Sequence, residues 1–432
     1  MKNYFAFITL VALCSISSTF AGGLDLNLYY GSRYVGLGGN HVGLTGDAYA
    51  PFYNPAAMTS VEKAAIAIDS STLVHQYEAP VGAHDSQRKS EWNIAPLFYT
   101  GGVYRLSDRI AVGLAFFPTA LEGGKFTGVD YGAGAPGGLN ASVLQGELSN
   151  LLVRLELAPS IAFKLVDHFS IGLSYRLAYT RFDTAAGKFF AGLPSGASQF
   201  QASYLNVSMD GWDANGLKMG AFLEKWNGLS AGLTYRLQVK PDLSGDASVS
   251  YYSTTASQFT TAQSVPSTMS PRIPAQLQAG VSYDWIPDTF MTAFTYEYTY
   301  SSSLNQISIN VTGFGPQTTP LNDHDSHSFH GGAEYTFHLA SQNKIVANYG
   351  MAFDTGATNS AFPNPLLPPA AVYVGYAGGA RYEFDRSILG AALNYGYYSR
   401  YSTPDSSLTG AEFNGKYGLE VWLAVLDYQY KF

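Results

Sequence analysis

The chain has 432 residues and a formal net charge of −8, and only 13% of its residues are charged, about half the share of a typical soluble domain. The acidic balance excludes a nucleic-acid-binding protein that works by electrostatic attraction. After residue 21 there is no uninterrupted apolar run of about 18 residues, so no transmembrane helix is predicted. Low charge together with 32 tyrosines and 45 glycines favours a β-barrel whose apolar residues alternate with others.

Residues 1–21 have the pattern of a secretory signal peptide. Lys2 provides a basic start, residues 4–16 are almost entirely apolar, and Thr19 and Ala21 supply the small residues of a cleavage site. The apolar run is too short to span a membrane. We expect cleavage after Ala21. Cleavage also removes Cys14, the only cysteine, so the mature chain is expected to have no disulfide and no cysteine metal site.

The next segment, residues 22–63, is rich in glycine and has no sustained period-2 apolar face. It ends near the run Tyr53-Asn54-Pro55-Ala56. Pro55 has no backbone N–H and restricts Asn54 to extended geometry, which would make a rigid kink. The simpler interpretation of Asn54-Pro55 is an ordinary turn. Because this segment precedes the first strand, we expect it to fold back into the lumen of a barrel as a plug.

From residue 64 onward, period-2 stretches recur and predict fourteen strands. The first covers 64–77, the last 419–432, and six hairpins pair 99–105 with 110–117, 151–164 with 169–180, 216–223 with 229–239, 275–283 with 289–300, 329–337 with 345–353 and 373–382 with 387–398. Longer Gly-, Pro- and Ser-rich connections alternate with the short turns, near 80–91, 119–150, 186–202, 251–270, 303–325, 355–369 and 403–416. This alternation predicts an all-β fold: a 14-stranded antiparallel transmembrane β-barrel over 64–432, with its short turns in the periplasm.

The two faces of the predicted strands differ in polarity. In residues 169–180, Ile171 and Leu173 share a face, and Arg176 lies on the other. An arginine facing lipid at the bilayer midplane costs about 2–4 kcal/mol, so the charged face must point into the lumen. The last strand ends in Phe432, and a terminal aromatic residue is typical of bacterial outer-membrane barrels. The inward face of this strand is polar near the C-terminus and becomes apolar from Val425 toward the N-terminal end of the strand, which suits a hydrophobic solute.

The runs Ser32–Gly39, Gly46-Asp47-Ala48 and Tyr53–Ala56 resemble the N-terminal hatch of the FadL/TodX family, outer-membrane transporters of long-chain fatty acids and aromatic hydrocarbons. The resemblance implies a barrel plugged by residues 22–63, with Asn54, Pro55 and Ala56 as hatch residues. It also implies substrate entry from the outer loops and sideways release into the membrane. The predicted mature start, Gly22-Gly23-Leu24, lacks the Ala-Gly-Phe start of fatty-acid members, so Leu24 stands there as the candidate contact in place of an aromatic residue.

Three further residues are candidates for substrate binding. Arg154 and Arg236 are expected to face the lumen, where an arginine binds a carboxylate through a bidentate pair. The alternative is a structural ion pair, for example between Arg154 and Glu156. Phe117 is an apolar inward residue. The apolar residues of the predicted loop 119–150 either form a landing surface for substrate or pack the loop onto the barrel rim.

The run 322–330 contains the one His/Asp cluster and could bind a metal or serve a barrel protease. A solvated loop explains it more simply. The expected function is passive outer-membrane transport of a hydrophobic small molecule, with no enzyme activity, no cofactor and no metal. The expected protein is a monomer in contact with outer-membrane lipid, without a nucleic-acid partner. The alternatives are a scaffold barrel of a secretion system, and a lipase or protease that depends on His324 or His327.

Overall fold

The computed structural model describes residues 28–44, 46–81, 86–130, 145–189, 200–253, 258–259, 262–312, 315–340, 342–402 and 415–432. The predicted signal peptide and Leu24 lie outside these residues. The strands are β1 (Ala64–Val81), β2 (Ser86–Lys89), β3 (Asn93–Arg105), β4 (Ile110–Asp130), β5 (Gln145–Leu157), β6 (Ser160–Val166), β7 (Phe169–Phe189), β8 (Phe200–Trp226), β9 (Leu229–Arg236), β10 (Leu243–Ser253), β11 (Gln258–Phe259), β12 (Gln263–Met269), β13 (Gln276–Ile286), β14 (Phe290–Thr299), β15 (Gln306–Val311), β16 (Gly315–Pro320), β17 (Ser326–His338), β18 (Lys344–Asp354), β19 (Tyr373–Phe384), β20 (Ser387–Ser402) and β21 (Lys416–Lys431).

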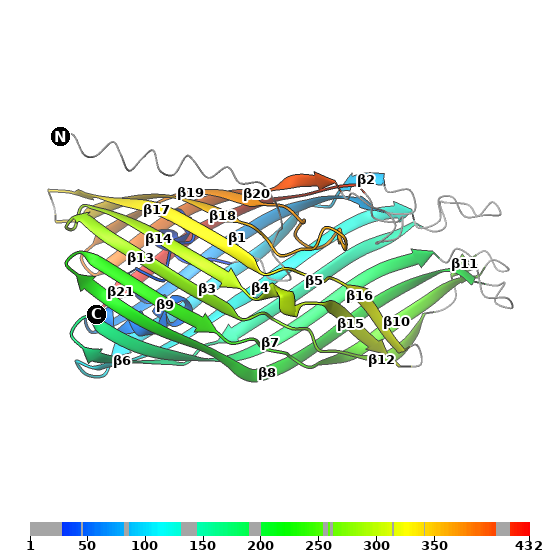
Figure 1. The fold of residues 1–432 in the computed structure, drawn as a ribbon, viewed down its shortest axis with the longest axis horizontal. Helices are drawn as coiled ribbons and strands as arrows, with labels where there is room; N and C mark the ends of the chain where they lie inside the picture. The colour runs from blue at the N-terminus through cyan, green and yellow to red at the C-terminus, as the bar shows by residue number, and fades with distance from the viewer. Residues whose placement is uncertain are drawn as a thin grey trace.

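The strands close into an antiparallel barrel (Figure 1). Closure is made by β1, which pairs with β3 on one edge and with the last strand, β21, on the other. Six barrel strands are interrupted, so that β2 and β3, β5 and β6, β9 and β10, β11 with β12 and β13, β14 and β15, and β16 and β17 each lie along one path. Counted this way, the described residues form fourteen barrel strands, which confirms the predicted fold.

The alternation read from the sequence sets the two faces of the wall. On β7, Ile171 and Leu173 are each 40% exposed on the outside, whereas Ser174 and Arg176 are buried inside. The outer face of the barrel is correspondingly apolar, as the lipid-facing band of a membrane barrel must be. None of the helices in the described part of the chain is long and apolar enough to cross a membrane.

Several strands are longer than the sequence predicts. The described residues of the predicted loop 119–150 are strand, because β4 continues to Asp130 and β5 begins at Gln145. Phe126 and Leu148 are buried in the interior cluster, so they do not offer an exposed landing surface; residues 131–144 lie outside the described part. The prediction failed here because glycines at 123, 124 and 128 and a register shift after Phe126 obscure the period of two.

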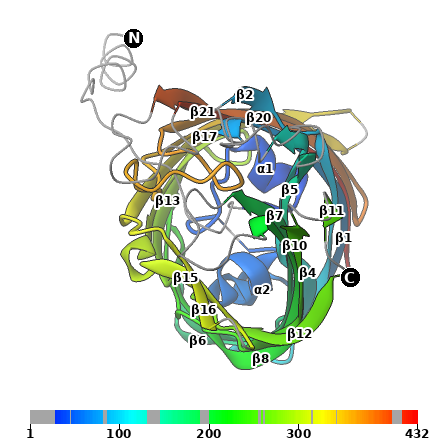
Figure 2. The same cartoon turned by 90° about the vertical axis from the view of Figure 1, so that its right-hand side faces the viewer.

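Residues 28–44 and 46–63, together called the lumen segment below, lie inside the ring of strands (Figure 2). They contain α1 (Ser32–Gly36), α2 (Ala50–Tyr53) and a 3₁₀ helix, η2 (Pro55–Ser60). Another 3₁₀ turn, η4 (Ser301–Ser303), follows β14. The lumen segment supplies much of the core, since Tyr30, Leu37, Tyr49 and Met58 are among its fully buried side chains.

Candidate functional site

The lumen segment touches the barrel wall at inward-facing glycines, where it approaches too closely for any side chain. A Cβ at Gly172 of β7 would collide with Ala56, and one at Gly232 of β9 would collide with the Val42 carbonyl. We call the wall residues of this kind the glycine belt: Gly113, Gly172, Gly220, Gly232, Gly280, Gly332, Gly350 and Gly390, on β4, β7, β8, β9, β13, β17, β18 and β20. The belt contacts the lumen segment around most of the ring: backbone atoms of the segment meet Gly172, Gly232, Gly280, Gly332 and Gly350, and its side chains meet Gly113, Gly220 and Gly390.

Asn54 fastens the lumen segment to this belt. Its Oδ1 accepts from the Ala56 N–H at 3.1 Å, which caps the 3₁₀ helix η2 that begins at Pro55. Its Nδ2 donates to the Val42 carbonyl at 3.2 Å and to the Ala221 carbonyl of β8 at 3.1 Å. Asn54, Pro55 and Ala56 are therefore brought together with the wall, as a buried cap rather than a surface turn.

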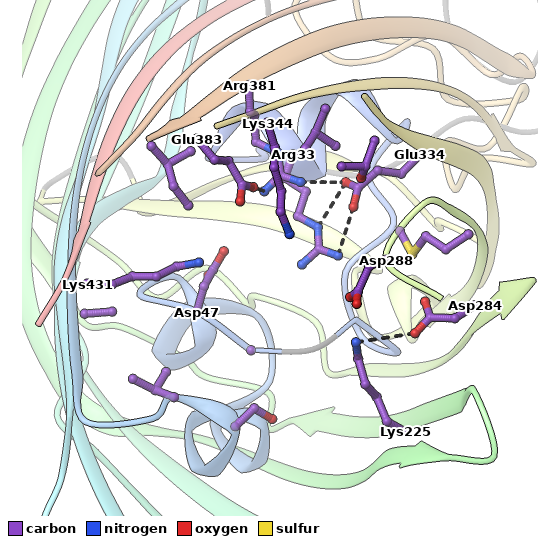
Figure 3. Close-up of a pocket in the computed structure, with 18 of the residues that line it drawn as sticks. Arg33, Asp47, Lys225, Asp284, Asp288, Glu334, Lys344, Arg381, Glu383 and Lys431 are labelled. Carbon is purple, nitrogen blue, oxygen red and sulfur yellow. Dashed lines mark hydrogen bonds and ion pairs between the residues drawn. The ribbon is translucent and has the colours of Figure 1, made fainter. Parts of the chain in front are cut away.

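A charged vestibule of about 500 Å³ lies at the short-turn end, beneath the lumen segment (Figure 3). Glu334 accepts from Arg33 at 3.3 Å and from Arg381 at 2.8 Å, while Lys225 pairs with Asp284 at 3.4 Å. The remaining charged residues labelled there are Asp47, Asp288, Lys344, Glu383 and Lys431. Burial raises the pKa of Asp47 in the lumen segment, although the Tyr49 N–H and Arg33 oppose this.

On the other side of the lumen segment, a cavity of about 60 Å³ combines aromatic and cationic side chains. Phe52 and Phe117 pack edge to face, with ring centroids 4.7 Å apart. Lys218 donates to the Phe52 carbonyl at 2.8 Å, and Arg236 lines the same cavity and donates to the Pro274 carbonyl at 3.4 Å. Ligand sites typically occupy about 300–1,000 Å³, so this cavity is closed and too small to hold a ligand in the present structure.

Arg154 lies in a buried ion-pair network beside that cavity. It bonds Asp213 at 2.7 Å and 3.2 Å and Glu156 at 3.0 Å, and Glu156 also accepts from Arg176. This is the structural ion pair that the sequence left open as the alternative for Arg154. Phe117 and Arg236, but not Arg154, line the cavity.

The backbone ladder of the barrel is broken between β3 and β4. The two strands pair only between Thr100–Arg105 and Ala111–Phe116. Beyond Phe116, β4 pairs with β5 alone, with a register shift at Pro118, which has no N–H to donate. A cleft of about 400 Å³, lined in part by Trp92, Gly123 and Leu151, adjoins the outer end of this break.

Tyr30 of the lumen segment closes the inner side of the break. Its hydroxyl donates to the Pro118 carbonyl at 2.5 Å, and its ring packs against Tyr99, Phe117 and Phe52. An unpaired carbonyl in a membrane wall costs several kcal/mol, which this hydroxyl offsets. Sequence reasoning did not identify Tyr30 or the break; the proline at 118 within an apolar strand was the available signal.

The His/Asp cluster is dispersed into separate structural contacts. His330 donates to the Gly38 carbonyl at 2.7 Å, the Tyr296 hydroxyl meets His327 Nδ1 at 2.8 Å, and Asp325 accepts from Tyr298 at 2.5 Å. Within the described ranges, no three His, Cys, Asp or Glu side chains converge in a way that could hold a metal ion.

A plugged fourteen-stranded barrel with a closed lumen cavity and an apolar outer face is the architecture of an outer-membrane transport protein. Residues 12–432 match the family model described as "Outer membrane protein transport protein (OMPP1/FadL/TodX)". The chain belongs to this family, and its place is the outer membrane. No curated protein matches its sequence.

Solved barrels of this family have the same fold. A Pseudomonas aeruginosa FadL homologue is 16% identical with a TM-score of 0.76, over 96% of this chain and 100% of the other. The Pseudomonas putida toluene transporter TodX is 17% identical with a TM-score of 0.72, over 94% and 99%. The Ralstonia pickettii toluene transporter TbuX is 18% identical with a TM-score of 0.68, over 93% and 98%. At these identities the likeness shows the fold.

Proposed function

We propose that the protein transports a hydrophobic compound passively. The compound binds beside Phe117 and leaves sideways between β3 and β4 when the lumen segment shifts. In this proposal residues 1–21 are the signal peptide and 22–63 form the hatch of a monomeric barrel. The break between β3 and β4 carries the proposal, because Tyr30 connects it directly to the lumen segment.

The alternative route, straight down the lumen, is opposed by two features. An apolar solute would have to cross the charged vestibule around Glu334 and Arg381. It forms no favourable interaction with these charged side chains. It would also have to displace the lumen segment from the glycine belt, although Gly172 and Gly232 fit its backbone closely. A local shift near Tyr30 opens the sideways route without either cost.

The side chains that line the closed cavity suit two substrate classes once the lumen segment shifts. TodX and TbuX are toluene transporters, and the rings of Tyr30, Phe52 and Phe117 would accept a similar aromatic solute here. Lys218 and Arg236, on the cavity wall, would bind the carboxylate of a fatty acid. We place Arg154 behind them, as the residue that orders Glu156.

Uptake tests the proposal. Cells with and without the protein are given labelled oleate or labelled toluene at limiting concentration, and we expect faster uptake with the protein. If cells with and without the protein took up both oleate and toluene at equal rates, transport would be overturned. Co-purification of a protein partner without an uptake difference would favour the scaffold alternative. Hydrolysis lost on substitution of His324 or His327 would favour an enzyme.

The sideways route needs its own variant. A Cβ at Gly123 would lie 3.5 Å from the Asn93 amide nitrogen, so the pair Asn93→Cys and Gly123→Cys is placed for a disulfide across the outer end of the break; the same Cβ lies 2.7 Å from the Asn150 carbonyl, so Gly123→Cys alone is a control for that contact. We expect oxidation to slow uptake and a reductant to restore it, with Asn93→Cys alone unaffected. Unchanged uptake by the oxidised pair would argue against this exit.

A further inference from the structure

The connection between β18 and β19, residues 355–371, crosses the outer mouth of the barrel; we call it the strap. Near its start, the Ala357 carbonyl accepts from the His324 N–H at 2.7 Å, beside β17. Near its end, the Leu366 carbonyl accepts from Asn150 of β5 at 3.0 Å. His324 follows β16, and Asn150 is on β5, the strand that pairs with β4. Figure 2 shows β16 across the ring from β4, so the two attachments lie on different walls of the barrel.

Two consecutive leucines of the strap face these two walls. Leu366 belongs to the interior cluster with Tyr77 of β1 and Leu148 of β5, and its side chain lies 2.9 Å from the position of a Cβ at Gly124. Leu367 packs with Leu304 and Leu321, at the connections that follow β14 and β16. The strap is therefore anchored from both sides and occupies the entrance above the lumen cavities.

The strap is stiff and carries no charge. Four prolines surround the two leucines, at positions 363, 365, 368 and 369, and Thr358 donates to the Pro368 carbonyl at 2.8 Å. Proline restricts the backbone, so the strap loses little entropy when it docks and moves as a unit when it leaves.

Two carboxyls hold the first part of the strap: Asp354, the last residue of β18, accepts from the Gly356 N–H, and Asp323 holds the first attachment. Asp323 is 6% exposed and accepts from the backbone N–H of Asn359 in the strap. None of the ion pairs among the described residues includes Asp323.

Apart from Asp354, which bonds the Gly356 N–H of the strap and the Ser328 hydroxyl, the charged or titratable groups of the surrounding elements are engaged elsewhere or belong to the same turn as Asp323. Arg272 donates to the Ser303 carbonyl at 3.1 Å, and Asp325 accepts from Tyr298 and from the Ser302 N–H. Tyr300 packs edge to face on Tyr298, and His324 follows Asp323 in sequence. Burial raises the pKa of Asp323 to about 7.

We propose that the strap is an entry lid, which must leave its docked position before a hydrophobic solute reaches the lumen, and that Asp323 makes docking pH-dependent. This inference rests on the proposed transport function. The docked strap binds a proton on Asp323 more tightly than the undocked strap does. Docking is therefore strongest in acid and weakens as the pH rises through about 7, where an ionised carboxylate would be buried without a cation.

A reversible lock tests the lid. The variant Asn150→Cys with Leu366→Cys joins the strap to β5 where the two residues already bond, and the predicted mature chain has no other cysteine. We expect oxidation to reduce uptake of labelled oleate and toluene at least tenfold, with recovery after reduction, and Asn150→Cys alone to show neither change. Full uptake by the oxidised variant would overturn the lid. No protein-dependent uptake by the reduced variant or by the unaltered protein would overturn transport itself.

The role of Asp323 is tested by pH. Uptake by the unaltered protein should be several-fold faster at pH 8 than at pH 6. Asp323→Asn keeps an acceptor for Asn359 without charge, so its uptake should stay at the slow, acid rate across this range. A pH dependence that survives in Asp323→Asn would overturn the assignment to Asp323, whatever the lock shows.

Discussion

Asp69 of β1 and Asp427 of β21 are register partners, and each carboxylate holds one of two consecutive residues of the lumen segment. Asp69 accepts from the Gly31 N–H at 2.6 Å, and Asp427 accepts from the Ser32 N–H at 3.0 Å. Both acids are buried, and no described ion pair includes either of them. The strand pair that closes the barrel thus also fixes the start of α1, next to Tyr30.

Asp427→Ala should release the start of the lumen segment. The substitution removes the acceptor for the Ser32 N–H and for the Tyr49 hydroxyl, and a hydrogen bond to a charged group contributes about 1.5–3 kcal/mol. We expect trypsin to cleave at Arg33 about 10 to 100 times faster. Asp427→Asn is the matched control, because it keeps an acceptor and removes the repulsion with Asp69. If both variants were cleaved equally fast, the clamp would not depend on the acceptor.

Gly172→Ala should displace the lumen segment from the glycine belt. The added methyl group would meet the Ala56 backbone, which is part of η2 and has little freedom to move. Overpacking of this kind typically costs about 1–3 kcal/mol. Gly331→Ala on β17 is the control, since a Cβ there meets nothing within 4 Å. We expect larger ion conductance in planar bilayers for Gly172→Ala alone; equal conductance would show that the belt does not hold the segment.

Tyr30→Phe should loosen the inner side of the break between β3 and β4. The ring still packs against Phe117, but the Pro118 carbonyl loses its donor. Loss of one neutral hydrogen bond costs about 1 kcal/mol, so the sideways route should open about fivefold more often. Uptake of labelled toluene at limiting concentration measures this. Slower uptake would indicate that the hydroxyl takes part in release instead of restraining it.

Acid should weaken the docking of the lumen segment through His41. Burial lowers the pKa of His41 to about 3, with Lys218 acting in the same direction, while its Nδ1 donates to the Gly39 carbonyl. An undocked His41 takes up a proton near its usual pKa of about 6.5. Docking is therefore strongest above that pH and weakens as the pH falls from 6.5 toward 3, by up to about 1.4 kcal/mol per unit.

Hydrogen exchange of residues 37–44, corrected for the intrinsic rate, measures this effect. Exchange should rise steadily below pH 6.5 in the unaltered protein and much less in His41→Gln. The raised pKa of Asp47 acts in the opposite direction and reduces the slope. A slope that is the same in both proteins would assign the acid sensitivity to another group.

Lys218→Met should separate the two substrate classes. The variant keeps an apolar side chain beside Phe52 but loses the ammonium that a carboxylate would bind. We expect oleate uptake to fall about tenfold relative to toluene uptake, whereas Lys218→Arg should preserve the ratio. The ratio cancels any general loosening caused by the lost bond to the Phe52 carbonyl. An unchanged ratio would exclude Lys218 as the carboxylate site.

The glycines of the belt show how much of the site was visible in the sequence. Gly172 lies on the face of residues 169–180 that carries Arg176 and was predicted to point inward, because this strand alternates cleanly, with Ile171 and Leu173 outward. Its purpose was not visible, since Ala56 lies more than a hundred residues away in the chain. The same holds for Arg154, whose partner Glu156 was foreseen from its proximity, whereas Asp213 on β8 was not.

The sequence by itself determined the number of strands, the two faces of the strands that keep a clear period of two, and a glycine-rich segment without that period ahead of the first strand, because these are local properties. Only the tertiary structure decided what meets across the barrel: Asp69 with Asp427, Tyr30 with Pro118, and the strap with Asn150. Those contacts depend on ring closure and strand register. Both are set by the packing of the whole barrel wall around the lumen segment, and no short stretch of the sequence encodes that packing.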